Sequence, residues 1–192
     1  MGFVTSYRTA AALVGVLLLA GCSSSLDDLD GPVRPLGDFY LGHNIVVASN
    51  ATKGPLSRDA TEEELETALK AAIDQRFRRF DGDRLYHIAI SIDGYVLAVP
   101  GIPVVANPRS ALIFGVTIWD DAREVKLNET PHRITVLEDL SGDTLVGSGL
   151  TRSADEQLAA LAYNAARATE RWMRENVEWF TPEPPAETAV AD

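Results

Sequence analysis

The sequence has a single cysteine, at position 22, among its 192 residues. No disulfide can therefore form within the chain, whatever the redox state of its compartment. Histidine is also scarce, and His43, His87 and His132 never occur at the spacing of a metal-ligating motif such as HExxH. We interpret all three histidines as structural or solvated, and we predict no metal site.

The familiar motifs of catalysis and nucleotide binding are absent as well. Neither GxxxxGK[ST] nor GxGxxG occurs, so no phosphate-binding loop is predicted. Gly147-Ser148-Gly149 lacks the full G-x-S-x-G frame of a nucleophile elbow and lies in a strand pattern, where a small-residue bulge is the better interpretation. We therefore predict no catalytic residue and no cofactor, and we expect that the protein is not an enzyme.

Positive charge and long apolar runs are both in short supply. The chain has 17 basic against 28 acidic residues and a formal net charge of −11, which disfavours nucleic acid as a partner. The apolar run from Ala10 to Ala20 is too short for a membrane-spanning helix, which needs about 20 residues. Its length fits the apolar core of a secretory signal peptide instead.

Leu19-Ala20-Gly21-Cys22 follows this run and places two small residues directly before the thiol. The stretch resembles the lipobox of bacterial lipoproteins. The resemblance implies cleavage before Cys22, a diacylglycerol thioether on Cys22 and an added N-acyl chain. Such acyl chains would anchor the mature protein to a membrane, facing the periplasm. Ser23 occupies the position where the enteric pattern has Asp for inner-membrane retention, which favours the outer membrane over the inner.

Composition divides the chain into four parts. Residues 1–21 are predicted to be the cleaved signal peptide. Residues 22–38 are rich in Ser, Asp, Pro and Gly and bury too little apolar surface to order themselves, so they predict a flexible tether from the lipidated cysteine. Residues 39–180 are predicted to form a single domain. Residues 181–192, rich in Pro, Glu and Ala, predict a disordered tail.

Two segments of the domain are predicted to be amphipathic helices. Thr61 is placed as an N-cap, with Glu64 three residues later completing a capping box, and apolar residues then recur at spacings of three and four towards Phe80. The second helix starts near Ser153, with Glu156 in the equivalent position, and runs to about Trp179.

Several segments between the helices alternate with a period of two and predict strands. Asp93-Gly94 leaves two alternatives open for Tyr95–Val99, a hairpin return or a continuation past a bulge. The predicted strands are Ile45–Ala48, Tyr86–Ile92, Leu112–Trp119 and His132–Leu137, with Glu124–Leu127 and Leu145–Leu150 as candidate returns. The order β-α-β-β-β(-β)-α predicts an α+β fold, a two-layer sandwich in which two helices cover one face of a mainly antiparallel sheet of about four to six strands. The first strand, helix and strand should form a right-handed crossover.

The segment from Val99 to Pro108 is apolar but interrupted by three prolines, so it predicts a loop. This loop presents Ile102, Val104 and Val105. Either these residues contact a partner or a lipid, or the loop folds back and covers the core.

These features together predict a non-enzymatic, lipid-anchored periplasmic lipoprotein with an envelope protein as partner. The layout loosely resembles that of small envelope lipoproteins, including assembly partners of outer-membrane machines and accessory subunits of ABC-type lipid transporters. The alternative is a carrier of a small apolar ligand or lipid, which would need a cavity of several hundred Å³. A hydrolase acting on the cell envelope is disfavoured by the missing catalytic residues.

Overall fold

The computed structural model describes residues 27–99, 109–138 and 153–181. Two units are distinguished in the chain, Met1–Val33 and Arg34–Asp192. Within the first, the described part contains one 3₁₀ turn, η1 (Asp27–Leu29). Cys22, the loop residues Ile102, Val104 and Val105, and the candidate strand Leu145–Leu150 lie outside the described residues.

The second unit contains a six-stranded mixed sheet. Its strands are β1 (Phe39–Val47), β2 (Thr52–Lys53), β3 (Arg84–Val96), β4 (Ala111–Asp120), β5 (Val125–Lys126) and β6 (His132–Leu137). β1 and β2 each pair with β3 in parallel, whereas β4 pairs with β3, β5 and β6 in antiparallel fashion. The parallel pairing of β1 with β3 is the arrangement that a crossover through the first helix requires.

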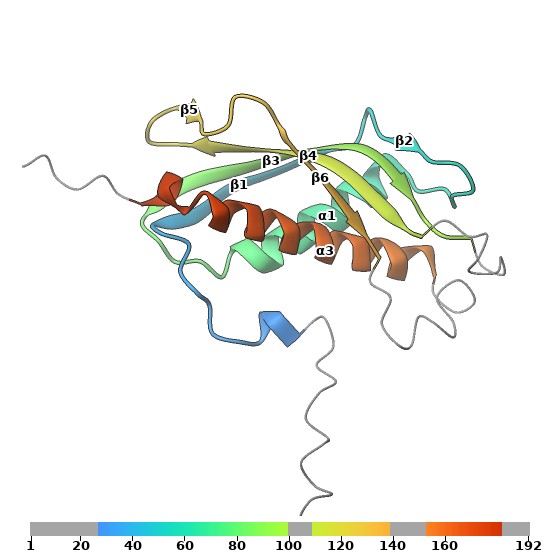
Figure 1. The fold of residues 1–192 in the computed structure, drawn as a ribbon, viewed down its shortest axis with the longest axis horizontal. Coiled ribbons are helices and arrows are strands. Elements are labelled where there is room, and N and C mark those ends of the chain that lie inside the picture. The colour runs from blue at the N-terminus through green and yellow to red at the C-terminus, as the bar shows by residue number, and fades with distance from the viewer. Residues whose placement is uncertain (1–26, 100–108, 139–152, 182–192) are drawn as a thin grey trace, which may run out of the picture. The chain divides into compact units, whose positions relative to one another are not determined.

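Two long helices lie on the same side of this sheet, α1 (Glu62–Phe77) and α3 (Ala154–Glu175), and α3 is followed by the 3₁₀ turn η2 (Val177–Phe180) (Figure 1). Each helix begins with a complete capping box, as the sequence predicts. The predicted α+β fold, with two helices on one face of the sheet, is thereby confirmed.

The structure decides between the two alternatives for Asp93-Gly94. β3 continues through this dipeptide, and its register with β4 shifts between Ile92 and Gly94, so the dipeptide is a bulge rather than a hairpin turn. Beyond the bulge Tyr95 is buried and Leu97 is 1% exposed, so the continued chain still contributes to the core.

An aromatic cluster joins the sheet to both helical ends. Phe39 stacks on Tyr86 at 5.5 Å between ring centroids, and it meets Phe77 and Phe180 edge-on at 5.9 and 5.4 Å. Such ring pairs add to the stabilisation that area burial alone gives. β1 therefore begins at Phe39, six residues before the strand that the sequence predicts at Ile45–Ala48.

The packed domain also reaches further towards the N-terminus than residue 39. Leu36 is 1% exposed and belongs to the core, within the segment that the sequence predicts to be a tether. The Asp38 N–H donates to the Phe180 carbonyl at 2.6 Å. Gly37 makes this approach possible, because its φ is +57° and a Cβ there would lie 2.3 Å from the Phe180 oxygen.

Candidate functional site

The most conspicuous surface of the domain is the outer face, by which we mean the face of the sheet turned away from the helices. Side chains alternate along a strand, so the neighbours of the buried Leu41, Val46, Tyr86 and Ile90 point outward. Four of these outward side chains are large, apolar and well exposed. They are Tyr40 (46%), Ile45 (53%), Val47 (45%) and Leu85 (40%). We call these four the apolar patch.

Strand pairing places the members of the apolar patch in two groups along β1 and β3, Tyr40 with Leu85 and Ile45 with Val47. Tyr40 lies opposite Leu85, and Ile45 lies opposite Ala89, because β1 and β3 run in parallel. In an all-parallel sheet the strands are normally covered on both faces, and their sequences are then apolar on both sides. β1 has this two-sided apolar sequence, although the helices cover only one of its faces. Several large exposed apolar side chains on one face of a sheet are a feature of surfaces that contact another molecule.

His43, His87 and Asp121 form a polar cluster, and along the strands His43 and His87 lie between the two groups of the patch. The His43 backbone N–H donates to His87 Nδ1 at 2.8 Å, and His87 Nε2 lies 3.0 Å from Asp121 Oδ1. Because Nδ1 accepts, the ring proton is on Nε2 and is donated to Asp121. Both nitrogens are thus engaged, so His87 has no lone pair left for a metal ion or for proton transfer. Within the described residues, no group of three His, Cys, Asp or Glu side chains is arranged to hold a metal ion.

The remaining histidine packs against an aromatic ring. His132 of β6 stacks on Trp172 of α3 at 4.4 Å with an interplanar angle of 2°, and Trp172 meets Trp179 edge-on at 5.5 Å. Trp172 is only 8% exposed. These rings therefore close the end of the helix–sheet layer and leave little aromatic surface for a ligand.

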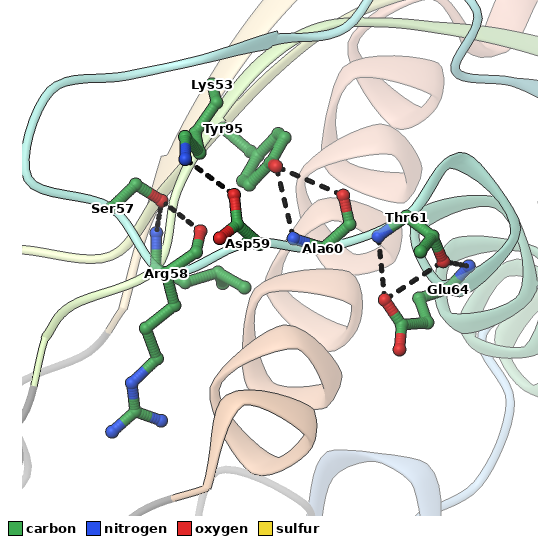
Figure 2. Close-up of polar contacts among 9 residues, drawn as sticks. Lys53, Ser57, Arg58, Asp59, Ala60, Thr61, Glu64 and Tyr95 are labelled. Atoms are coloured by element: carbon green, nitrogen blue, oxygen red, sulfur yellow. Dashed lines mark hydrogen bonds and ion pairs between the residues drawn. The ribbon is translucent and has the colours of Figure 1, made fainter.

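The polar residues before α1 serve to position the helix (Figure 2). The Tyr95 hydroxyl accepts from the Ala60 N–H and donates to the Ala60 carbonyl, each at 3.1 Å. Lys53 pairs with Asp59 at 2.5 Å, and this bond raises the pKa of the Lys53 amine. At the N-cap, hydrogen bonds from Thr61 lower the pKa of the Glu64 carboxyl. These contacts hold the chain between β2 and α1 in place, and each of their polar groups has a partner within the domain.

Ion pairs tie the two helices together. Arg76 of α1 is 4% exposed and lies 2.8 Å from Glu170 of α3, and Glu170 also contacts Arg174 at 2.6 Å. The guanidinium of Arg76 lies 5.2 Å from the centroid of the Tyr163 ring. This arrangement fixes the angle between the helices and leaves the outer face of the sheet unaffected.

Two of the hollows on the surface of the described domain lie beside the helices, one between β6 and α3 and one near the start of α1, and neither is lined mainly by apolar side chains. The first, of about 340 Å³, is lined by Thr135, Val136, Leu137, Asn164, Arg167 and Arg171. The second, of about 480 Å³, is lined by Thr61, Glu63, Glu64, Thr67, Ala68, Asp155 and Leu158. The helix–sheet layer, where a carrier would hold its ligand, is filled by fully buried side chains such as Phe39, Phe77, Tyr86 and Phe114.

Sequence reasoning did not identify the apolar patch. Its residues come from separate elements, and their exposure depends on which face of the sheet the helices cover. One local signal was available, since Ile45-Val46-Val47 is apolar without interruption, as expected for a strand covered on both faces.

The chain matches no family model and no curated protein. Among solved structures it is similar to a candidate lipoprotein from Caulobacter crescentus CB15 (14% identity, 77% of this chain and 96% of that chain, TM-score 0.39). It is also similar to a protein of family DUF330 from Xanthomonas campestris (15%, 78% and 87%, TM-score 0.35). A third is a minor lipoprotein from Acinetobacter baumannii (16%, 70% and 93%, TM-score 0.30). With identities below 25% and TM-scores below 0.5, these likenesses carry no argument about activity or partner.

Within the described residues, no helix is both long and apolar enough to cross a bilayer.

Proposed function

We propose that the protein is a lipid-anchored lipoprotein of the bacterial envelope whose domain binds another envelope protein and catalyses no reaction. Cys22 is the attachment point, and the acyl chains hold the domain on the periplasmic side, at the outer membrane. The support for the anchor is the Leu19-Ala20-Gly21-Cys22 sequence with its preceding apolar run.

The observation that carries the binding role is the apolar patch on the outer face. Tyr40, Ile45, Val47 and Leu85 are 40–53% exposed and lie on two adjacent strands. Apolar and aromatic side chains gathered in this way are typical of the centre of a protein interface.

The filled core supports this proposal over the carrier alternative. A lipid carrier needs an apolar cavity. In this domain Ile73, Phe77, Tyr86 and Phe114 lie in the helix–sheet layer, each is 0% exposed, and all four belong to one hydrophobic core cluster. The engaged nitrogens of His87 likewise give no support to a hydrolytic role.

Residue-dependent capture from membranes tests the proposal. The full-length protein, the Leu85→Glu variant and the Val177→Glu variant are crosslinked in membranes and purified, and the captured proteins are identified by mass spectrometry. Val177 is the matched control, because it is 42% exposed, like Leu85 at 40%, but lies in η2 rather than on the outer face.

We expect the wild type and the Val177→Glu variant to capture the same envelope protein, and Leu85→Glu to lose it by about ten-fold or more, as for a central interface residue. Equal capture by all three proteins, or recovery of a lipid and no protein, would contradict the proposal.

A further inference from the structure

The edge of the sheet at β1 lacks most of the features that usually block strand pairing; a register shift between Leu41 and Asn44 interrupts its first half, so the regular part of the edge is Asn44 to Val47. Among the described residues, β1 pairs with β3 and with no strand on its other side. Edge strands expose unpaired N–H and C=O groups, and natural proteins block them with charge, proline or very short strands. β1 has nine residues, FYLGHNIVV, with no Asp, Glu, Lys, Arg or Pro among them.

The backbone contacts at both ends of the edge show which groups are available. The Ala48 N–H donates to Glu66 Oε1, and the Ala48 carbonyl accepts from Ala51, each at 2.8 Å. Since successive N–H groups alternate in direction along an extended strand, those of Asn44 and Val46 point to the same outer edge as that of Ala48. The His43 N–H points the other way, towards His87 on β3. The available edge is therefore centred on Ile45.

We infer that β1 pairs with β1 of a second copy of this chain, antiparallel and about a two-fold axis at Ile45. In this register Asn44 lies opposite Val46 of the second copy, and the two such pairs exchange about four main-chain hydrogen bonds. Ile45 then lies opposite Ile45 of the second copy, in the close, non-hydrogen-bonded position on the outer face. The inference rests on the proposed function in one respect, since it assigns a partner to part of the apolar patch.

Symmetry favours a second copy over an unrelated strand, and net charge confines a contact between copies to an uncharged part of the surface. Each chain has a formal charge of −11, so two copies repel each other over most of their surfaces. β1 carries no charge, so the paired strands themselves bring no like charges together; an acidic group close to this edge is Glu66 of α1, whose carboxylate accepts from the Ala48 N–H. With a two-fold axis, the N–H and C=O groups that one copy offers at β1 are the same groups that the other copy offers. Such an isologous contact therefore needs only one binding surface on the chain. At 53%, Ile45 is the most exposed member of the patch, and contact with Ile45 of the second copy covers one side of it.

This geometry joins the two outer faces into one. The two-fold axis is perpendicular to the sheet, so both pairs of helices lie on one side and both outer faces on the other. Tyr40 and Leu85 of each copy remain exposed, and because the paired strands are antiparallel, Tyr40 of each copy lies on the opposite side of the axis, roughly 17 Å from it along the strand.

Charge substitution at Ile45 tests the dimer. The full-length protein and three variants, Ile45→Lys, Ile45→Glu and the control Leu85→Lys, are purified in detergent and analysed by sedimentation over a dilution series. Leu85 lies on the same face but on β3, away from the edge. We expect dimers for the wild type and Leu85→Lys, and dimerisation weakened at least about ten-fold for each Ile45 variant, because like charges then lie directly opposite. Circular dichroism verifies that the variants are folded.

Mixing gives the sharper result. An equimolar mixture of Ile45→Lys and Ile45→Glu should regain the dimer, because opposite charges then face each other across the axis. Ile45→Cys should form an intermolecular disulfide under mild oxidation, since the Cα atoms of such a pair lie about 4.5 Å apart. Leu85→Cys and the wild type should form none.

A monomeric wild type, an unchanged dimer for Ile45→Lys, or a mixture that does not regain the dimer would overturn the inference. The two proposals fail separately. Capture of an envelope protein that depends on Leu85, with a monomeric wild type, removes the dimer and keeps the proposed function. A dimer that depends on Ile45, without capture of a protein that depends on Leu85, keeps the dimer and removes the proposed function.

Discussion

At the scale of single residues, short polar side chains determine where the helices begin. Thr61 Oγ1 accepts from the Glu64 N–H at 3.2 Å, and the Glu64 carboxylate accepts from the Thr61 N–H at 2.7 Å. Ser153 and Glu156 make the same two contacts at 3.1 and 2.7 Å before α3. Each pair satisfies two N–H groups that a helix otherwise leaves without an intrahelical acceptor.

We predict that Thr61→Ala lowers the free energy of unfolding by about 1 kcal/mol, because α1 loses its N-cap acceptor. Urea denaturation measures the difference. Thr67→Ala is the control, since Thr67 is exposed within the same helix and Ala is the better helix former there. Equal stability of Thr61→Ala and the wild type would show that the cap contributes nothing.

The Glu64 carboxylate makes a pH-dependent contribution. Hydrogen bonds from Thr61 lower its pKa below the ordinary value of 4.5. A group with a lowered pKa in the folded state stabilises the fold above its unfolded pKa, and this stabilisation is lost as the pH falls through the folded value. We therefore expect Glu64→Gln to be less stable than the wild type at pH 7, with the difference disappearing at acid pH, below 4.5. Denaturation curves at several pH values measure this; a difference that does not change with pH would contradict it.

At the scale of elements, buried polar contacts couple α1 to α3. Glu170 is the ion-pair partner of Arg76, whose side chain is 4% exposed. We predict that Glu170→Ala lowers the free energy of unfolding by about 3 kcal/mol, because it removes one partner of a buried ion pair and loses the contacts of Glu170 with both Arg76 and Arg174. The double variant Arg76→Met/Glu170→Leu should regain most of that loss, since it removes both charges. If the double variant were no more stable than Glu170→Ala, the ion-pair explanation would be wrong.

The helices and the central strands could be predicted because their signals are local. The capping boxes span three residues, and the alternation from Tyr86 to Ile92 is visible without knowledge of any partner. The first half of β1 could not be predicted in this way. The register shift between Leu41 and Asn44 interrupts its alternation, and Phe39 is placed by contacts with Phe77, Tyr86 and Phe180, which are distant in sequence.

The same distinction applies to the sites. Cys22 could be singled out because its motif is contiguous. The apolar patch could not, because Tyr40 and Leu85 meet only through strand pairing, and because their exposure follows from the placement of both helices on the opposite face. The sequence instead indicated Ile102, Val104 and Val105, whose role as a contact remains a prediction.

At the scale of the whole molecule, the proposed anchor and the apolar patch have separate tasks. The acyl chains on Cys22 would place the protein at the membrane, and the patch would bind its partner there. We predict that Cys22→Ser abolishes acylation and moves the protein from the membrane fraction to the soluble fraction, because the mature chain loses its lipid. Mass spectrometry and fractionation measure both effects. An unmodified Cys22 in wild-type membranes would contradict the anchor.

The central claim is that the outer face of the sheet contacts a protein while the chain is held at the membrane. Site-specific photo-crosslinking in intact cells tests it most directly, with a photoreactive residue placed at Tyr40 on the outer face or at Thr67 on the exposed side of α1. The account predicts a discrete protein adduct from position 40 and none from position 67. The absence of an adduct from position 40, or equal adducts from both positions, would contradict it.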